Sequence, residues 1–371
     1  MVIRKQAKII IFILAGLLSV SSCQQAVYKV NESKQLEKVD MGAVVDEIIN
    51  TPENQINILK YSLLLSKAVE PGLNIELQKQ RFDNMAETIS PKLKGITDPK
   101  EIINVLNNYI FKDLKFRMPK VKSLEELEFK HKFYPIVLDT KEGDCGGVGM
   151  IYLCLAERLN LPIYGVRLPR HFFLRYDDGK TRINIETTSN GKNMTDQEYI
   201  TLLEPVLNKA NKDGAEFGFM RNMTKKQVLA SFLFSGIAIK DYNPDKELVT
   251  WEIMCVDYAI KIDSDEWSYY SFKGSVLIPL DPALKDQYRK ALKELLKAYD
   301  LYHYDLSVIV KIAIGYFRLG DFVNSKNKCD ELLSLYNWKD VEKRYDTEMV
   351  TMLIKMRDEC QKKMEDMPVP K

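Results

Sequence analysis

Hydrophobic side chains recur every three or four residues along most of this chain, which is the spacing of one face of an α-helix. Ahead of residue 145 the spacing is clearest in three segments: 56–74, 75–93 and 98–116. The last segment opens with Asp98–Pro99, a typical helix start with a capping carboxylate and a proline in the first turn. The pattern therefore predicts three helices before residue 145.

The spacing changes after residue 160. Short segments rich in β-branched and aromatic residues occupy 162–168, 171–178 and 181–188. Asp178–Gly179 lies between the second and the third, and Asp-Gly is typical of a hairpin turn. Helices combined with a small antiparallel sheet predict an α+β domain, which we place at residues 42–220.

Helical spacing returns in residues 221–371 with a loose internal repeat. Gly236, Gly274 and Gly315 each lie in an apolar helical segment, at spacings of 38 and 41 residues, and a second helical segment follows each. Small residues at such a period favour stacked helix pairs. The segment 315–336 resembles a tetratricopeptide unit, in which Gly-Asp marks the turn between two helices. The pattern predicts an all-α helical-repeat region.

The N-terminus has the pattern of an export signal. Residues 1–22 combine a basic start, an apolar run and small residues, and the run is shorter than the roughly 20 residues that span a bilayer. Small residues before Cys23 resemble a bacterial lipobox, which implies cleavage there and a lipid on the thiol. The polar residues 23–41 predict a tether. This interpretation places the protein in the bacterial cell envelope, membrane-anchored on the exported side; an ordinary signal peptide or a membrane helix is the alternative.

The charge balance argues against a nucleic-acid partner. The chain has 54 basic and 52 acidic residues, and removing Arg4, Lys5 and Lys8 with the signal leaves 51 basic residues. Nucleic-acid-binding proteins usually carry a strong basic excess.

The cysteines that follow the lipobox are scattered: Cys145, Cys154, Cys255, Cys329 and Cys360. They form no Cys-x-x-Cys pair and no metal-like spacing with histidine, so the sequence implies no metal or organic cofactor. Cys154 and Cys255 lie in apolar helical segments and are predicted to be core residues. Only Cys145 has a polar, glycine-rich setting.

The segment around Cys145 fits a reactive thiol. In EGDCGG a turn leads directly into an apolar helix, so the partial positive charge of the helix N-terminus favours the thiolate. Gly146 and Gly147 leave room for a substrate, and the Cys145 amide is available to a developing oxyanion. Asp144 is the expected N-cap of this helix.

Two further side chains fit a site built on Cys145. His171 on the second predicted strand would be the general base, and Glu186 on the third would orient its ring. With the hairpin turn at Asp-Gly, positions 171 and 186 lie opposite each other, with Cβ atoms about 5 Å apart. Asn184 is an alternative orienting partner.

The stretch DCGGVGMIYLCLAERLNLPIYGVRLPRHFFLRY resembles the transglutaminase-like superfamily, with a cysteine at the head of a buried helix and then a strand that bears histidine. The likeness extends over most of residues 55–340, to a bacterial branch with a leading helical segment and trailing tetratricopeptide-like repeats. It implies a papain-like fold and a Cys–His–acid triad, carried here by Cys145, His171 and Glu186. Glutamate stands where the family usually has aspartate, so a longer side chain has to reach the histidine.

These observations predict a lipid-anchored, thiol-dependent acyl-transfer or amide-hydrolysing enzyme that forms a thioester. Its substrate would be a peptide or protein, and an envelope-associated one fits the exported location. Water as acceptor gives hydrolysis, and an amine gives crosslinking. Hydrolysis is favoured because the sequence specifies no amine-binding pocket. The alternative is a noncatalytic scaffold whose helical repeats bind a partner protein on their concave face.

Overall fold

A computed structural model describes residues 39–122, 126–169, 171–202, 219–238, 250–279, 281, 283–335 and 347–366. The predicted signal segment 1–22, Cys23 and all but the last three residues of the predicted tether lie outside these ranges. Within them, no helix combines the length and the hydropathy that a membrane span requires.

Four capped helices come first in the described chain. Their bounds are α1 Met41–Asn50, α2 Ile58–Val69, α3 Ile75–Leu93 and α4 Pro99–Asn107. Each follows an Asp or Asn whose side chain accepts a hydrogen bond from an amide of the first turn, an amide that has no acceptor within the helix. The three helices predicted from hydrophobic spacing are confirmed as α2, α3 and α4.

Short helical segments fill the stretch between α4 and residue 145. Helix α4 continues into a π-helical turn, Asn108–Asp113, and the helices α5 Phe129–Lys132 and α6 Tyr134–Thr140 follow. The backbone carbonyl of His131 accepts a hydrogen bond from the amide of Asp144 at 2.8 Å. This bond fixes α5 beside the start of the next helix.

Helix α7, Cys145–Arg158, belongs to the largest hydrophobic core. Residues 147–156 are all buried, so the helix is enclosed on every side. Two glycines allow a strand to approach it closely: a Cβ added at Gly149 or at Gly165 would lie 2.7 Å from the ring of Phe172. The Phe172 ring therefore fills the space between α7 and the first strand.

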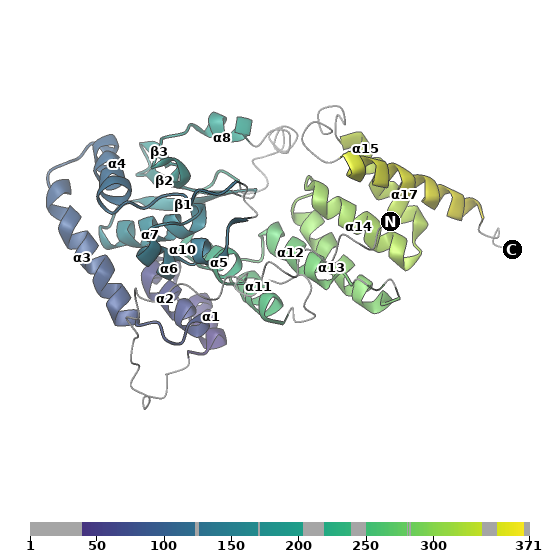
Figure 1. Cartoon of the computed structure of the whole chain (residues 1–371), viewed down its shortest axis with the longest axis horizontal. Coiled ribbons are helices and arrows are strands. Elements are labelled where there is room, and N and C mark those ends of the chain that lie inside the picture. Colours follow the sequence, from purple (N-terminus) through teal and green to yellow (C-terminus); the bar gives the residue numbers. More distant parts are fainter. Residues whose placement is uncertain are drawn as a thin grey trace, which may run out of the picture. The chain divides into compact units, whose positions relative to one another are not determined.

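An antiparallel sheet packs on α7 (Figure 1). Its strands, in the order β1-β2-β3, are β1 Ile163–Leu168, β2 His171–Asp177 and β3 Arg182–Ile185. The three predicted strand segments are confirmed, and the described chain is otherwise helical, as an α+β fold requires. Leu168 pairs with His171, which places His171 at the end of the sheet where β1 stops.

The predicted pairing of His171 with Glu186 is wrong by two positions. Leu174 pairs with Ile185, which puts Phe173 rather than His171 level with Glu186. Because side chains alternate along a strand, a shift by two residues keeps both on the same face. His171 and Glu186 are therefore diagonal neighbours across the two strands.

The cause of this shift is the hairpin loop, which is Gly179–Lys180 rather than the predicted Asp178–Gly179. Asp178 donates its amide to the carbonyl of Thr181 at 3.4 Å and so belongs to the strand pair. Its carboxylate accepts hydrogen bonds from the amides of Lys180 and Thr181, at 2.9 and 2.7 Å. Gly179 has a φ of 85°, which glycine adopts without strain.

Helices make up the rest of the described chain. Their bounds are α8 Asp196–Leu202, α10 Lys225–Phe232, η5 Leu233–Ile237, α11 Thr250–Ile262, α12 Trp267–Leu277, α13 Lys285–Leu301, α14 Leu306–Leu319, α15 Phe322–Leu335 and α17 Thr347–Glu365. From α12 to α15, each packs on the next (Figure 1). Helices α10 and α11 contribute buried side chains to the core around α7. The division into 42–220 and 221–371 stays a prediction.

Two of the three repeat glycines pack against the same helix. A Cβ at Gly274 in α12 would lie 2.6 Å from Cγ of Leu295 in α13. One at Gly315 in α14 would lie 3.4 Å from Cδ1 of Leu292, also in α13. The predicted Gly-Asp turn is confirmed, because Gly320 ends α14 with a φ of 84° just before α15 begins.

Candidate active site

Cys145 is the first residue of α7, where helix amides without helical acceptors gather. Asp144 caps the helix as predicted, and its Oδ1 accepts a hydrogen bond from the amide of Gly147 at 2.8 Å. The Thr187 hydroxyl donates to the Cys145 carbonyl at 3.5 Å and ties the helix start to the chain beyond β3. Cys145 is half-buried, whereas the other cysteines in the described ranges are buried, which confirms the core position predicted for two of them.

His171 begins β2 and interacts with both Glu186 and Cys145. Its Nε2 is 2.7 Å from Oε2 of Glu186, and its side chain is 26% exposed. The Cys145 side chain is close enough to the ring to raise the His171 pKa. Because Nε2 faces the carboxylate, Nδ1 is the ring nitrogen that remains for the thiol.

These partners favour a protonated histidine. Burial lowers the pKa of His171, but the hydrogen bonds to Cys145 and Glu186, and the charges of those groups, outweigh burial and raise the pKa to about 10. The ring therefore holds its proton at neutral pH. An imidazolium beside a thiol favours the thiolate form.

Glu186 is 3% exposed and accepts four hydrogen bonds. Its Oε1 accepts from the amide and hydroxyl of Thr188, and its Oε2 accepts from His171 and from the hydroxyl of Tyr199 at 2.9 Å. Burial raises the pKa of Glu186, but the bonds to His171 and Thr188 outweigh it and hold the pKa below its usual value. The glutamate side chain is long enough for both tasks: its Oε2 binds His171, and its Oε1 caps the 3-10 helix Thr187–Ser189.

Tyr199, in α8, is part of the site and was not predicted from the sequence. Its ring stacks on Phe173, with centroids 4.0 Å apart and planes 15° apart, and lies 6.0 Å from the His171 ring. Burial and the charge of Glu186 raise the pKa of Tyr199, so its hydroxyl keeps the proton that it donates to the carboxylate. No motif surrounds Tyr199, so only its position in space identifies it.

Asn184, the alternative partner for His171, binds another group. Its Oδ1 accepts a hydrogen bond from Nε of Arg175 at 2.8 Å, and its Nδ2 donates to Asp196 at 2.6 Å. Arg175 is 2% exposed and forms an ion pair with Asp196 at 2.7 Å. The structure therefore brings Glu186, and not Asn184, to the histidine.

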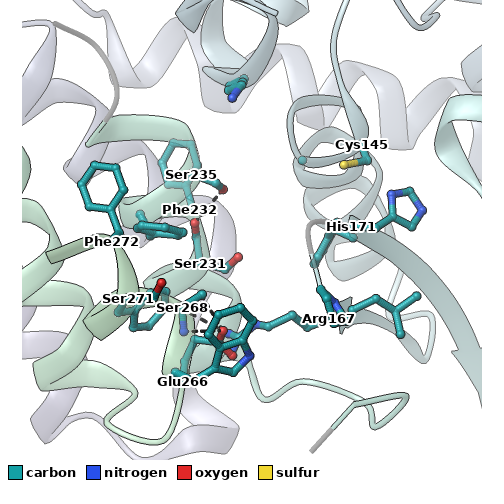
Figure 2. Close-up of a pocket in the computed structure, with 18 of the residues that line it drawn as sticks. Cys145, Arg167, His171, Ser231, Phe232, Ser235, Glu266, Ser268, Ser271 and Phe272 are labelled. Carbon is teal, nitrogen blue, oxygen red and sulfur yellow. Dashed lines mark hydrogen bonds and ion pairs between the residues drawn. The ribbon is translucent and has the colours of Figure 1, made fainter. Parts of the chain in front are cut away.

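Cys145 and His171 open into a cavity of about 520 Å³. Figure 2 shows these two residues on one side of the cleft and Phe232, Ser235 and Phe272 on the other. The far wall comes from α10, η5, α12 and the start of α14. The local sequence around Cys145 contains no sign of this wall. Across the described ranges, no group of three His, Cys, Asp or Glu side chains is arranged to hold a metal ion.

Arg167 connects the sheet with the far wall of the cleft. It lies near the end of β1 and forms ion pairs with Asp263, at 3.1 Å, and with Glu266. Its guanidinium also donates to the hydroxyl of Tyr269 at 3.3 Å. The two carboxylates are buried. These bonds hold the start of α12 beside the strand that leads to His171.

Comparisons with known proteins place the cysteine, the histidine and the glutamate within one family domain. Residues 77–233 match the model of the transglutaminase-like superfamily. The chain is also similar to a solved structure, "Crystal structure of menin reveals the binding site for Mixed Lineage Leukemia (MLL) protein", with 13% identity and a TM-score of 0.48 over 91% of this chain and 87% of that chain. No curated protein matches the chain. Residues 77–233 therefore form a domain of the transglutaminase-like superfamily.

Proposed function

We propose that this chain is a thiol-dependent acyl-transfer or amide-hydrolysing enzyme, with Cys145 as nucleophile, His171 as base and Glu186 as the group that orients the base. The observation that carries the proposal is the position of His171, which is hydrogen-bonded to Glu186 and close enough to Cys145 for that residue to raise the His171 pKa. Glu186 fixes the ring through Nε2, so Nδ1 holds the proton next to the sulfur. The family match over 77–233 gives further support.

The proposed reaction starts from a thiolate and an imidazolium. The Cys145 sulfur attacks the carbonyl carbon of an amide, and a tetrahedral intermediate forms. As the C–N bond breaks, the amine leaves with the proton from Nδ1 of His171, and a thioester remains on Cys145. The neutral imidazole then takes a proton from water as the water oxygen attacks the thioester. Release of the carboxylic acid restores the thiolate and the imidazolium.

The N-terminus of α7 suits the negative oxygen of the tetrahedral intermediate. The Cys145 amide is the first of the helix and has no acceptor within it. The neighbouring Gly147 amide is held by Asp144, which fixes the direction of the turn. One oriented amide donor of this kind contributes about 3 kcal/mol to transition-state stabilisation, and the helix dipole acts in the same direction.

Thiol labelling tests the proposal. Iodoacetamide should alkylate Cys145 at pH 7 about tenfold faster than a free peptide thiol, because a protonated imidazole next to a thiol and a helix N-terminus both favour attack by sulfur. His171→Ala should remove that excess. His303→Ala is the matched control, because His303 lies between α13 and α14 and does not line the cleft. If Cys145 labels at the rate of a peptide thiol in the unmodified chain, the enzyme proposal is wrong and the noncatalytic scaffold is favoured.

The proposal includes a lipid anchor on Cys23 and a position on the exported side of a bacterial cell envelope. Its support is the basic start, the short apolar run and the small residues before Cys23. Mass spectrometry of the native protein should find residues 1–22 removed and a diacylglycerol on Cys23. A Cys23→Ser chain that remains in the membrane fraction would contradict the anchor.

The proposal also treats the C-terminal helices as tetratricopeptide-like repeats that bind a protein partner. It is supported by the consecutive packing of α12 to α15 and by the close approach of helices at Gly274 and Gly315. In an experimental structure, the pair α12–α13 should superpose on the pair α14–α15. Pairs with clearly different packing angles would contradict a repeat.

A further inference from the structure

Aromatic side chains are concentrated in the part of the cleft that follows the sheet in the chain. Six of them line the cleft: Phe219, Phe232, Phe234, Trp267, Tyr269 and Phe272. Four of the six are buried, whereas Phe234 and Phe272 are only half-buried. These two rings therefore present apolar surface to the cleft, and an exposed apolar surface of this kind often marks a binding site.

The rings of Phe234 and Phe272 form a fixed corner. Phe234 belongs to η5 and Phe272 to α12, and their centroids are 5.4 Å apart with planes at 82°. The buried ring of Tyr269 supports Phe234, with centroids 5.1 Å apart. Aromatic rings prefer edge-to-face or offset stacked partners. A third ring that enters this corner can contact a face and an edge together.

This aromatic corner begins close to the nucleophile. A Cβ added at Gly146, the residue after Cys145, would lie 3.9 Å from Oγ of Ser235. Ser235 directly follows Phe234 in η5, a π-helical turn, and such turns often occur at functional sites. Figure 2 shows Ser235 across the cleft from Cys145. A side chain next to a carbonyl group on Cys145 can therefore reach the corner.

We propose that Phe234 and Phe272 form a subsite that binds an aromatic side chain on the acyl side of the scissile amide. This inference rests on the proposed function and names its substrate class: peptides or proteins with an aromatic residue directly before the bond that is cleaved. Binding removes the apolar surface of both partners from water, which favours an aromatic residue over a small one.

The hydroxyl groups of the same wall favour a peptide over a fatty acyl chain. Ser235 donates its hydroxyl proton to the carbonyl of Ser231 at 2.8 Å, so its oxygen keeps lone pairs that can accept from an amide. The side chains of Ser231 and Ser271 also line the cleft (Figure 2). A peptide supplies N–H groups to such acceptors, and an alkyl chain supplies none. Apolar rings with a few orienting polar groups are the usual lining of a selective pocket.

Three chloromethyl ketones test this inference on the full chain. Two are made from N-acetyl-phenylalanine and N-acetyl-alanine, and the third is a straight-chain alkyl chloromethyl ketone without amide groups. In each case the Cys145 sulfur displaces chloride and a thioether forms, and mass spectrometry measures the rate at that residue. Relative to a free peptide thiol, the phenylalanine probe should react about tenfold faster than the alanine probe. The alkyl probe should be slower than the phenylalanine probe.

Variants of the two rings decide the result. Phe234→Ala and Phe272→Ala should each lower the ratio of the phenylalanine rate to the alanine rate, and the ratio removes any change in thiol reactivity. Phe272→Leu keeps much of the apolar surface with little risk to folding, and should give an intermediate ratio. Phe322→Ala is the matched control and should leave the ratio unchanged. Phe322 is also half-buried and in an edge-to-face pair, with Phe317 at 5.7 Å, and is not among the described residues that line the cleft.

The two proposals fail in different ways. An equal ratio in the unmodified chain and in both alanine variants would overturn the aromatic subsite, even if iodoacetamide labels Cys145 rapidly. An alkyl probe that reacts fastest of the three would overturn the choice of a peptide. If iodoacetamide labels Cys145 no faster than a peptide thiol, the proposed thiol chemistry itself is wrong.

Discussion

Replacing Glu186 with glutamine tests the coupling between the carboxylate and the histidine. The two oxygens of Glu186 accept four hydrogen bonds, two from Thr188 and one each from His171 and Tyr199. An amide has only one acceptor oxygen, so two of these donors would face an NH₂ group. If the amide oxygen stays with Thr188, the histidine loses both its acceptor and its counter-charge.

The size of the effect follows from the buried position of this bond. A hydrogen bond to a charged group contributes about 1.5–3 kcal/mol, and each pKa unit corresponds to about 1.4 kcal/mol. Glu186→Gln should therefore lower the pKa of His171 by about 1 to 2 units from its value of about 10. The direction is downward because Glu186 stabilises the protonated ring and has no comparable effect on the neutral one.

Alkylation by iodoacetate reads this pKa through the charge of the ring. The imidazolium attracts the anionic reagent, so the rate relative to iodoacetamide should stay high until the pH reaches the His171 pKa and then fall. In Glu186→Gln this fall should begin about 1 to 2 pH units lower than in the unmodified chain. Glu76→Gln, on an exposed position of α3, is the control. Identical profiles for Glu186→Gln and the unmodified chain would refute the role assigned to the carboxylate.

Three further substitutions probe the surroundings of the site. Tyr199→Phe keeps the stacked ring and removes a donor that shares Oε2 of Glu186 with His171, so the His171 pKa should rise by about 1 unit and the fall in the iodoacetate-to-iodoacetamide ratio should move to higher pH; an unchanged profile would make the hydroxyl irrelevant. Asp196→Ala leaves the buried Arg175 charge without its ion pair and should lower the free energy of unfolding in urea by about 2 kcal/mol. The loss is smaller than for a fully buried pair because Asp196 is half-exposed. Gly274→Ala should destabilise the chain by about 1–3 kcal/mol, because its Cβ would overlap α13; equal thermal stability would contradict the close helix approach.

The start of α7 could be predicted from the sequence because its determinants are local. The capping carboxylate of Asp144, the thiol of Cys145 and the apolar residues after them are consecutive in the chain. The three strands were also predictable from their composition. In both cases the residues that determine the element are neighbours in the sequence, so the element can be predicted without knowledge of the fold.

The strand register was not predictable from the turn motif alone. An Asp-Gly pair fits a hairpin loop at either of two positions, and the choice depends on which carboxylate binds which loop amide. Asp178 joins the strand pair, and Gly179 begins the loop. The predicted pair of His171 and Glu186 was nevertheless correct, because an error of two residues in the register leaves both side chains on the same face of the sheet.

Tyr199 and the far wall of the cleft depend on contacts between distant segments. Tyr199, on α8, donates to Glu186 beyond the end of β3, and Lys311, on α14, lines the cleft and donates to Ser275 of α12. Neither residue lies in a recognisable motif. Contacts between distant segments could therefore not be predicted from the sequence and become visible only in the folded chain.

The ion pairs of Arg167 have a practical consequence for protein engineering. Because they fasten α12 to the strand next to His171, a chimera that exchanges the segment from α12 to α14 must keep Asp263 and Glu266 as its joint. With that joint retained, grafting the corresponding helices from another protein would change the far wall of the cleft and leave Cys145, His171 and Glu186 in place.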